Sequence, residues 1–312
     1  MKIVFLDAYS IGNADDSALN GLGEYNRYEH TTPEQVLSRC EGADVVITNK
    51  VKLMQTELEN LPSLKLICIA ATGMNNVDLK IAAEKGITVK NVADYSTDSV
   101  AEQTFAMALG LIHQTQYYDQ YVKTGSYSKS GLFTHHDRPF FELKGKKWGI
   151  IGMGHIGRRV AEIATVFGAQ IAYYSTSGKN MDAGFPCLSL NDLMENCDII
   201  SIHAPLNEQT QYLLDYEKLC LMKPTAFLIN VGRGGIVRET DLAQALREKR
   251  LAGAALDVYE QEPTPLDSPL LSSDIREKLL MSPHIAWASA EARQRLVDTM
   301  VQHIMNQKKP MK

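Results

Sequence analysis

Three polar residues have side chains suited to hydride-transfer chemistry and stand shortly after apolar segments typical of buried strands. They are Arg233, Glu262 and His284. An arginine can hold a carboxylate through two parallel hydrogen bonds, and a histidine, which titrates near pH 6.5, can deliver or accept a proton. A carboxylate bonded to that imidazole favours its protonated form and fixes its tautomer. Because the carboxyl ends of parallel strands meet at one edge of a sheet, we expect the three to converge there. Such a set suits the reduction of a 2-oxo acid beside a nicotinamide.

A glycine-rich motif predicts a binding site for a dinucleotide. Residues Gly152-Met153-Gly154-His155-Ile156-Gly157 form a complete GxGxxG pattern that follows a strand-like segment and opens a helix-like one. Gly152 permits a tight turn, Gly154 lets a pyrophosphate approach the backbone, and Gly157 allows close packing of helix on strand. The helix N-terminus supplies amide donors and a positive dipole. The alternative is a glycine-rich turn that serves packing only, but the strand-to-helix context favours the cofactor.

The identity of the dinucleotide depends on residues about 20 positions further along. NAD enzymes usually place an acid there for the ribose hydroxyls. This chain has Ser175 and Thr176 instead, followed by Lys179. Hydroxyls can bind either a free ribose hydroxyl or a 2′-phosphate, and Lys179 either pairs with that phosphate or only faces solvent. We therefore predict a nicotinamide dinucleotide, NAD with NADP possible, and the preference between the two stays open.

Short apolar segments that alternate with helical patterns predict parallel sheets covered by helices. The predicted strands of the first half are 2–8, 45–49, 64–70 and 87–92, with helices from about Thr32 and Asn76; those of the second half are 147–151, 170–175, 198–204, 226–231, 253–258 and 279–282. A long helix from Asp98 to about Lys123 precedes the second series, and a last helix from about Ala290 to Asn306 follows it. Six strands match the doubly wound dinucleotide-binding architecture. The second sheet is therefore expected to be inserted into the first domain.

Composition excludes several classes of protein. The chain has 312 residues, of which 45% are hydrophobic and 22% charged, an ordinary globular balance. Its net charge of −5 gives no overall attraction for nucleic acid or anionic lipid. No apolar stretch reaches about 18 residues, so no membrane span is expected, and the acidic Asp7 comes too early for a signal peptide. Five widely spaced cysteines without a CxxC pair indicate a reducing cytoplasm. His135-His136-Asp137 lacks the spacing of a helical metal site, so no metal is predicted.

Five motifs in order carry a family resemblance. They are GMGHIG (152–157), HAPLNEQT (203–210), INVGRGGIV (229–237), ALDVYEQEP (255–263) and SPHIAWAS (282–289). Together they resemble the D-isomer-specific 2-hydroxyacid dehydrogenases, and YSTDSVAEQ (95–103), YYSTSGKN (173–180) and Trp287 are most similar to the glycerate dehydrogenase (hydroxypyruvate reductase) branch.

The resemblance implies a fold and a role for each matching residue. The fold would be α/β with two doubly wound open-sheet domains: a Rossmann dinucleotide-binding domain, 98–287, inserted into a flavodoxin-like substrate domain, 1–97 and 288–312. Arg233 would bind the substrate carboxylate and carbonyl, His284 would be the general acid of reduction, and Glu262 would pair with His284. The other implied contacts are, for the substrate carboxylate, Thr72, Gly73, Met74 and Asn75; for the cofactor, Gly152, Gly154, His155, Ile156, Gly157, Ser175 and Thr176; and for its nicotinamide half, His203, Ala204, Pro205, Thr210, Val231, Gly232 and Asp257.

The resemblance also implies a homodimer formed by the helix and loop after residue 98, and a small 2-oxo or 2-hydroxy acid as substrate, most closely hydroxypyruvate and D-glycerate. Three alternatives share the fold. A dinucleotide-sensing corepressor would bind NADH and catalyse slowly. A glyoxylate reductase of the same fold is the second alternative. A formate dehydrogenase would carry a glutamine-like partner where this chain has Glu262.

Overall fold

The computed structural model describes residues 1–181 and 183–307, which form two compact units. The terminal unit consists of Met1–Ser96 and the segment that starts at Trp287, and the central unit is Thr97–Ala286. Each unit is built on a parallel sheet with helices on both faces, so the predicted α/β class with two open-sheet domains is confirmed.

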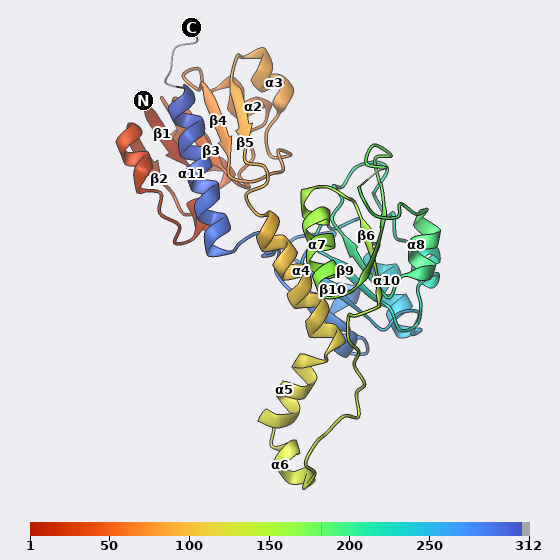
Figure 1. Cartoon of the computed structure of the whole chain (residues 1–312). Coiled ribbons are helices and arrows are strands. Elements are labelled where there is room, and N and C mark those ends of the chain that lie inside the picture. The colour runs from red at the N-terminus through yellow and green to blue at the C-terminus, as the bar shows by residue number, and fades with distance from the viewer. Residues whose placement is uncertain (182, 308–312) are drawn as a thin grey trace. The chain divides into compact units, whose positions relative to one another are not determined.

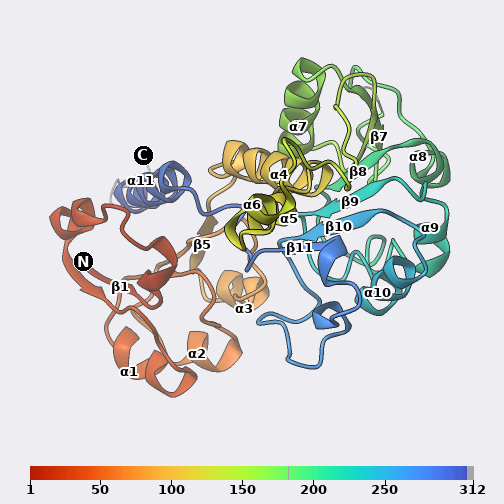
Figure 2. The same ribbon diagram turned by 90° about the horizontal axis from the view of Figure 1, so that it is seen from below.

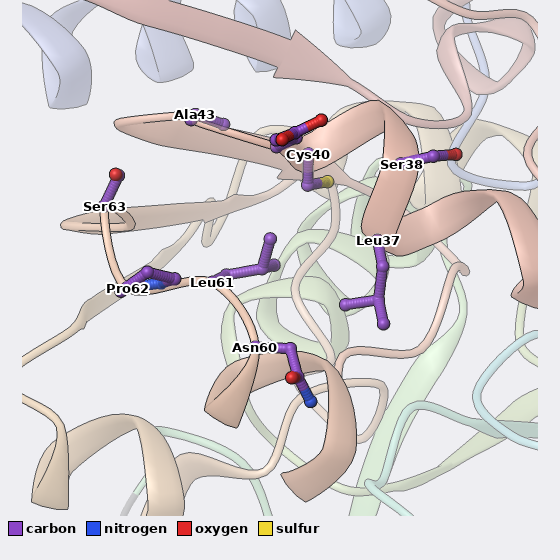
Figure 3. Close-up of a pocket in the computed structure, with 10 residues that line it drawn as sticks. Leu37, Ser38, Cys40, Ala43, Asn60, Leu61, Pro62 and Ser63 are labelled. Atoms are coloured by element: carbon purple, nitrogen blue, oxygen red, sulfur yellow. The ribbon is translucent and has the colours of Figure 1, made fainter.

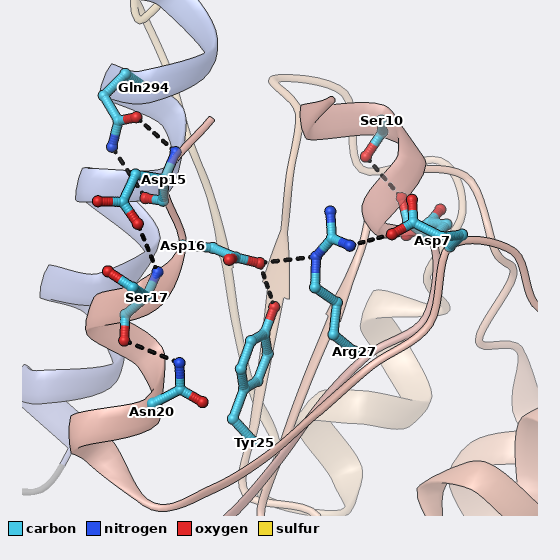
Figure 4. Close-up of polar contacts among 10 residues, drawn as sticks. Asp7, Ser10, Asp15, Asp16, Ser17, Asn20, Tyr25, Arg27 and Gln294 are labelled. Carbon is cyan, nitrogen blue, oxygen red and sulfur yellow. Dashed lines mark hydrogen bonds and ion pairs between the residues drawn. The ribbon is translucent and has the colours of Figure 1, made fainter. Parts of the chain in front are cut away.

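The sheet of the terminal unit has the order β2-β1-β3-β4-β5, and every neighbouring pair is parallel. This is the flavodoxin-like order. Its strands are β1 (Lys2–Phe5), β2 (Glu24–Arg27), β3 (Val45–Thr48), β4 (Leu66–Ile69) and β5 (Thr88–Asn91). β2 is the strand that the apolar pattern did not predict, because none of its residues is fully buried. Tyr25 and Arg27 on this edge strand both donate to the carboxylate of Asp16, at 2.6 and 3.0 Å (Figure 4).

Helices from both ends of the chain cover the terminal sheet. One face packs against α11 (Ala290–Gln307), and the other against α1 (Val36–Cys40), α2 (Gln55–Glu59) and α3 (Leu79–Glu84). Figure 1 shows α11 lying along this sheet beside β1. The amide of Gln294 on α11 accepts the Asp15 N–H at 2.8 Å and donates to its carbonyl at 3.1 Å. The last helix thus completes the first sheet. α3 starts at Leu79, three residues later than predicted, because Asp78 caps it.

The sheet of the central unit has the order β11-β10-β9-β8-β6-β7, all parallel. Its strands are β6 (Lys147–Ile151), β7 (Gln170–Tyr174), β8 (Ile199–Ile202), β9 (Phe227–Asn230), β10 (Gly253–Leu256) and β11 (Leu279–Met281). The six predicted strands are confirmed. A parallel bridge between Tyr173 and Cys187 adds a rudimentary strand beside β7. In the six-stranded order, the chain runs from β6 outward to β7 on one side and from β8 to β11 on the other. Doubly wound sheets bind their ligands at such a reversal, here between β6 and β8.

Helices cover both faces of the central sheet (Figure 2). They are α4 (Thr97–Ile112) and α7 (His155–Val166) on one face, and α8 (Leu190–Asn196), α9 (Tyr216–Cys220) and α10 (Glu239–Arg247) on the other. The predicted single helix from Asp98 to Lys123 is wrong in one respect. It breaks at Gln114, whose φ is +53°, into α4 and α5 (Thr115–Lys123), and α6 (Ser126–Ser130) follows. In Figure 1, α5 and α6 project away from the rest of the central unit.

A cavity of about 460 Å³ lies in the terminal unit, between the end of α1 and the segment after α2 (Figure 3). Its lining residues include Cys40, Ala43, Leu61 and Pro62. These segments lead into β3 and β4, so the cavity is at the amino end of the strands. Ligands of such sheets bind beyond the carboxyl ends, and this cavity is therefore not the candidate site.

Candidate active site in the central unit

The glycine motif forms the turn between β6 and α7. Gly152 has a φ of +94°, and a Cβ placed on it would lie 2.9 Å from the backbone nitrogen of Ala204. The turn therefore packs directly on the end of β8. A Cβ on Gly157 would lie 2.2 Å from the Gly152 carbonyl oxygen, so α7 approaches the turn closely. These contacts explain two of the three glycines by packing.

Gly154 differs from the other two glycines because nothing in the described structure lies within 4 Å of a Cβ placed on it. It precedes α7 directly, so the helix N-terminus and its amide donors open toward the same region. His155 and Ile156, the first residues of α7, are exposed and half-buried. An open approach to backbone amides at a helix N-terminus fits a pyrophosphate. The motif thus fits a dinucleotide.

The segment after β7 is tied to the glycine turn. Asn180 Nδ2 donates to the carbonyl oxygen of Met153 at 3.3 Å. Ser175 is buried, Thr176 is half-buried, and Lys179 is exposed and makes no ion pair within the described part of the chain. Residues 174–181 contain no carboxylate. After β7, where NAD enzymes usually have an acid for the ribose hydroxyls, this chain therefore has hydroxyl side chains and one lysine.

Glu262 and His284 meet at the edge formed by the ends of β10 and β11. Nδ1 of His284 lies 2.7 Å from Oε2 of Glu262, and Oε1 of Glu262 accepts the Tyr259 N–H at 3.1 Å. About a quarter of the imidazole and a third of the carboxylate side chain remain exposed. The carboxylate accepts a hydrogen bond from Nδ1–H, which leaves Nε2 as the nitrogen available to another group.

Asp257 holds the segment that carries His284. This fully buried carboxylate accepts the Ser282 hydroxyl at 2.5 Å and the backbone N–H groups of Ile285 and Ala286 at 2.9 and 2.8 Å. His284 between them has a φ of +55°, a conformation that is uncommon for a non-glycine residue. The three bonds to Asp257 fix the backbone on either side of it.

Arg233 lies on a short loop after β9 that the side chain of Asn230 shapes. The Asn230 amide donates to the Arg233 carbonyl at 3.0 Å and accepts the Gly232 N–H at 3.1 Å. The guanidinium donates to the carbonyl of Gly232 at 2.7 Å and is otherwise exposed. A Cβ on Gly234 would lie 1.7 Å from the Tyr259 carbonyl oxygen, so the Arg233 loop packs on the segment that leads to Glu262.

His203 follows β8 and its imidazole is tied to a buried chain of hydrogen bonds. Its Nε2 lies 3.0 Å from the hydroxyl of Ser201, which also accepts the indole N–H of Trp148 at 2.9 Å. Nδ1 is buried and has no partner among the described residues. Burial lowers the pKa of His203 to about 3, so this imidazole is neutral at physiological pH.

The remaining predicted residues fall into two groups. Thr210 is fully buried and its hydroxyl closes the loop after β8 by donating to the Pro205 carbonyl at 2.7 Å. Ala204 and Val231 are buried, and Pro205 is exposed. The residues 72–75 belong to the terminal unit, where they follow β4. Among the described residues, no acceptor pairs with the backbone N–H groups of Gly73, Met74 and Asn75.

Comparison with known proteins identifies the family. The sequence profile of the family described as "D-isomer specific 2-hydroxyacid dehydrogenase, NAD binding domain" matches residues 105–286. The chain belongs to this family. It is thus an oxidoreductase with an NAD-binding domain.

Similar members of the family match along nearly the whole chain. The glycerate dehydrogenase of Methylorubrum extorquens is 36% identical, over 97% of this chain and 95% of that protein. The hydroxypyruvate reductase of Blautia hydrogenotrophica is 36% identical, over 97% and 96%. The structure of an NADPH-dependent glyoxylate/hydroxypyruvate reductase from Sinorhizobium meliloti, in complex with NADP and malonate, matches with a TM-score of 0.81 at 27% identity, over 99% and 94%.

Several residues that shape the site of this family member were not predicted. Asn230, Ser201 and Ser282 are polar residues inside or beside apolar strands. A polar residue at the end of a buried strand signals a side chain that bonds to a nearby backbone or neighbour. Glu239 and Glu260, which bind each other's backbone, carry no such signal because acids at helix starts and turns are common.

No helix of the described residues is long and apolar enough to cross a bilayer.

The neutral burial of His203 predicts a dependence of stability on pH. The unfolded imidazole binds a proton below about pH 6.5, whereas the folded one stays neutral down to about pH 3. The free energy of unfolding therefore decreases as the pH is lowered from about 6.5 to about 3. Between pH 7 and 5 this site costs about 2 kcal/mol. In urea unfolding, the free energy of unfolding should decrease between pH 7 and pH 5 by about 2 kcal/mol less for His203→Asn than for the wild type. Equal losses in the two proteins would contradict the prediction.

Proposed function

We propose that the protein uses a nicotinamide cofactor to reduce a small 2-oxo acid, and that hydroxypyruvate, reduced to D-glycerate, is its substrate. The observation that carries the proposal is the 2.7 Å contact between His284 Nδ1 and Glu262 at the edge of the central sheet. The relatives named glycerate dehydrogenase and hydroxypyruvate reductase support this choice of substrate.

The two side chains divide the proton-transfer work. Bound NADH supplies the hydride that reaches the substrate carbonyl carbon. His284 gives the proton on Nε2 to the carbonyl oxygen during reduction and takes it back in the reverse direction. Glu262 accepts a hydrogen bond from Nδ1 and so holds the imidazole in place and fixes its tautomer. Catalysis of this kind contributes about 10²–10⁴-fold to a rate.

Arg233 and the loop of residues 72–75 bind the substrate in this proposal. The guanidinium can release the Gly232 carbonyl and donate two parallel bonds to a carboxylate, which also polarises the adjacent carbonyl. The loop supplies the N–H groups of Gly73, Met74 and Asn75, which lack acceptors among the described residues. Thr72 shapes this loop, since its hydroxyl donates to the Val92 carbonyl at 3.1 Å.

The domain boundaries and cofactor contacts are also part of the proposal. Residues 98–287 form the dinucleotide-binding domain, and 1–97 with 288–312 form the substrate domain; the compact units support this division. In this proposal the pyrophosphate is bound by Gly152, Gly154, His155, Ile156 and Gly157. The ribose is bound by Ser175 and Thr176. The nicotinamide half is bound by His203, Ala204, Pro205, Thr210, Val231, Gly232 and Asp257. For Asp257 and Thr210 this role adds to the bonds that they make within the fold.

We further propose a cytoplasmic location. All five cysteines are free thiols. Cys40, Cys68 and Cys197 are buried, and burial raises their pKa values to about 12, 12 and 11. Protonated buried thiols act as small apolar side chains, which suits a reducing compartment.

Steady-state kinetics test the reaction. With hydroxypyruvate, glyoxylate and pyruvate, we expect the highest kcat/KM for hydroxypyruvate. His284→Ala should lower kcat by about 10²–10⁴-fold without weakening NADH binding, since the imidazole acts on the proton only. Arg233→Ala should raise KM and also lower kcat. No turnover of any 2-oxo acid by the wild type, or loss of NADH binding in His284→Ala, would contradict the assignment.

Titration of cofactor binding tests the role of Lys179. If its ammonium pairs with a 2′-phosphate, Lys179→Ala should weaken NADP⁺ binding about tenfold and leave NAD⁺ binding within about twofold. Intrinsic fluorescence quenching gives both dissociation constants without any turnover. Unchanged NADP⁺ affinity would show that Lys179 is only a solvated loop charge.

The projecting segment of α5, α6 and the following loop is the proposed homodimer contact. Phe133 is 95% exposed and Leu132 62% exposed, beside the aromatic cluster of Tyr117, Tyr121 and His135. We expect light scattering to give a dimer for the wild type and a monomer for Phe133→Asp, because a charge cannot be buried there unpaired. Leu266→Asp is the matched control, since Leu266 is 97% exposed elsewhere in the central unit. A monomeric wild type would contradict the proposal.

A further inference from the structure

Glu239 and Glu260 bind each other's backbone in a reciprocal clamp. The Glu239 N–H donates to Oε1 of Glu260 at 2.7 Å, and the Glu260 N–H donates to Oε1 of Glu239 at 2.6 Å. Glu239 is the first residue of α10, so its amide is one of the helix-terminal donors that need an acceptor from outside the helix. The two bonds join this helix to the segment 259–262, 21 residues away.

The clamp lies where two loops of the proposed site meet. On one side, Glu260 is two residues from Glu262, whose Oε1 accepts the neighbouring Tyr259 N–H. On the other side, a Cβ on Gly234 would lie 1.7 Å from the Tyr259 carbonyl oxygen and 2.8 Å from the Glu260 nitrogen. The chain then runs from Gly234 to Glu239. The bonds between Glu239 and Glu260 therefore connect the segment that carries Glu262 to the end of the chain segment that follows Arg233.

The electrostatics of Glu239 favour a geometric role over a charge role. Burial raises the pKa of this half-buried carboxyl, and the negative charges of Glu260 and Glu262 raise it further, whereas hydrogen bonds from the Glu260 N–H and from Ser268 lower it. A third acid beside Glu262 is electrostatically unfavourable. What the acid supplies is an oxygen acceptor for the Glu260 N–H.

We propose that Glu239 is a positioning residue for the reaction: its bond to the Glu260 backbone places Glu262 against the His284 imidazole and holds the Arg233 loop beside it. This inference rests on the proposed function. Glutamine keeps an acceptor oxygen at the same position, whereas alanine removes it and aspartate is too short to reach the Glu260 N–H. These three substitutions therefore separate geometry from charge.

The variants are compared in kcat for hydroxypyruvate reduction and in the ¹H chemical shift of the His284 Nδ1–H that bonds Glu262. Glu239→Ala should lower kcat about tenfold. It should also move the Nδ1–H signal upfield, since a displaced carboxylate no longer accepts this hydrogen bond. Glu239→Gln should keep kcat within about twofold of the wild type and leave the Nδ1–H signal in place. Glu248→Ala is the control, because Glu248 is an acid at the other end of α10 that bonds Tyr216 and Arg250.

The outcomes keep the two proposals distinguishable. Lower thermal stability of Glu239→Ala with wild-type kcat and an unchanged Nδ1–H signal would overturn the positioning role, as would a glutamine variant as impaired as alanine. If Glu239→Ala does not fold, Glu239→Asp tests the same loss of reach, and an unchanged Nδ1–H signal there counts equally against the positioning role. Absence of turnover in the wild type would refute the proposed function, while the Nδ1–H signal would still decide the role of Glu239.

Discussion

The hydrogen bond between Glu262 and His284 joins two segments that leave the central sheet from neighbouring strands. Parallel strands make this possible, because every strand delivers its following loop to the same edge. Glu262 comes after β10 and His284 after β11, 22 residues apart in sequence and 2.7 Å apart in space. Everything proposed about proton transfer depends on this contact. Asp257 stabilises this contact because it accepts the backbone N–H groups of the two residues that follow His284.

Close approach of backbones is the second constraint, and it explains why glycines gather at this edge. Gly152 packs on Ala204, and Gly234 packs on the Tyr259 carbonyl. A side chain at either position would push apart two loops that carry candidate residues. Gly152 and Gly234 thus serve the packing of the loops, whereas a Cβ on Gly154 would meet nothing within 4 Å among the described residues, which leaves room for the proposed phosphate contact.

The sequence allowed the sheet, its strand-end residues and the glycine turn to be predicted, because apolar strands and GxGxxG have local signals. It did not predict β2, whose residues Glu24–Arg27 are mostly polar, are never fully buried and pair with β1 at a sheet edge. It also missed the break at Gln114, since nothing in the helical periodicity of that segment marks a positive φ. The clamp of Glu239 and Glu260 depends on a contact between distant backbone groups. Such contacts become visible only once the loops are placed.

Two histidines lie at the ends of strands in the same sheet, and their surroundings separate what each can do. His203 bonds Ser201 through Nε2, its Nδ1 is buried, and burial lowers its pKa to about 3, so it is neutral near physiological pH. His284 is partly exposed and bonds a carboxylate through Nδ1, which leaves Nε2 open to another group. Titratable groups of one kind in contrasting environments mark different roles. The environment, more than the residue type, therefore makes His284 the better candidate for the proton donor, and His203 packs beside the glycine turn instead.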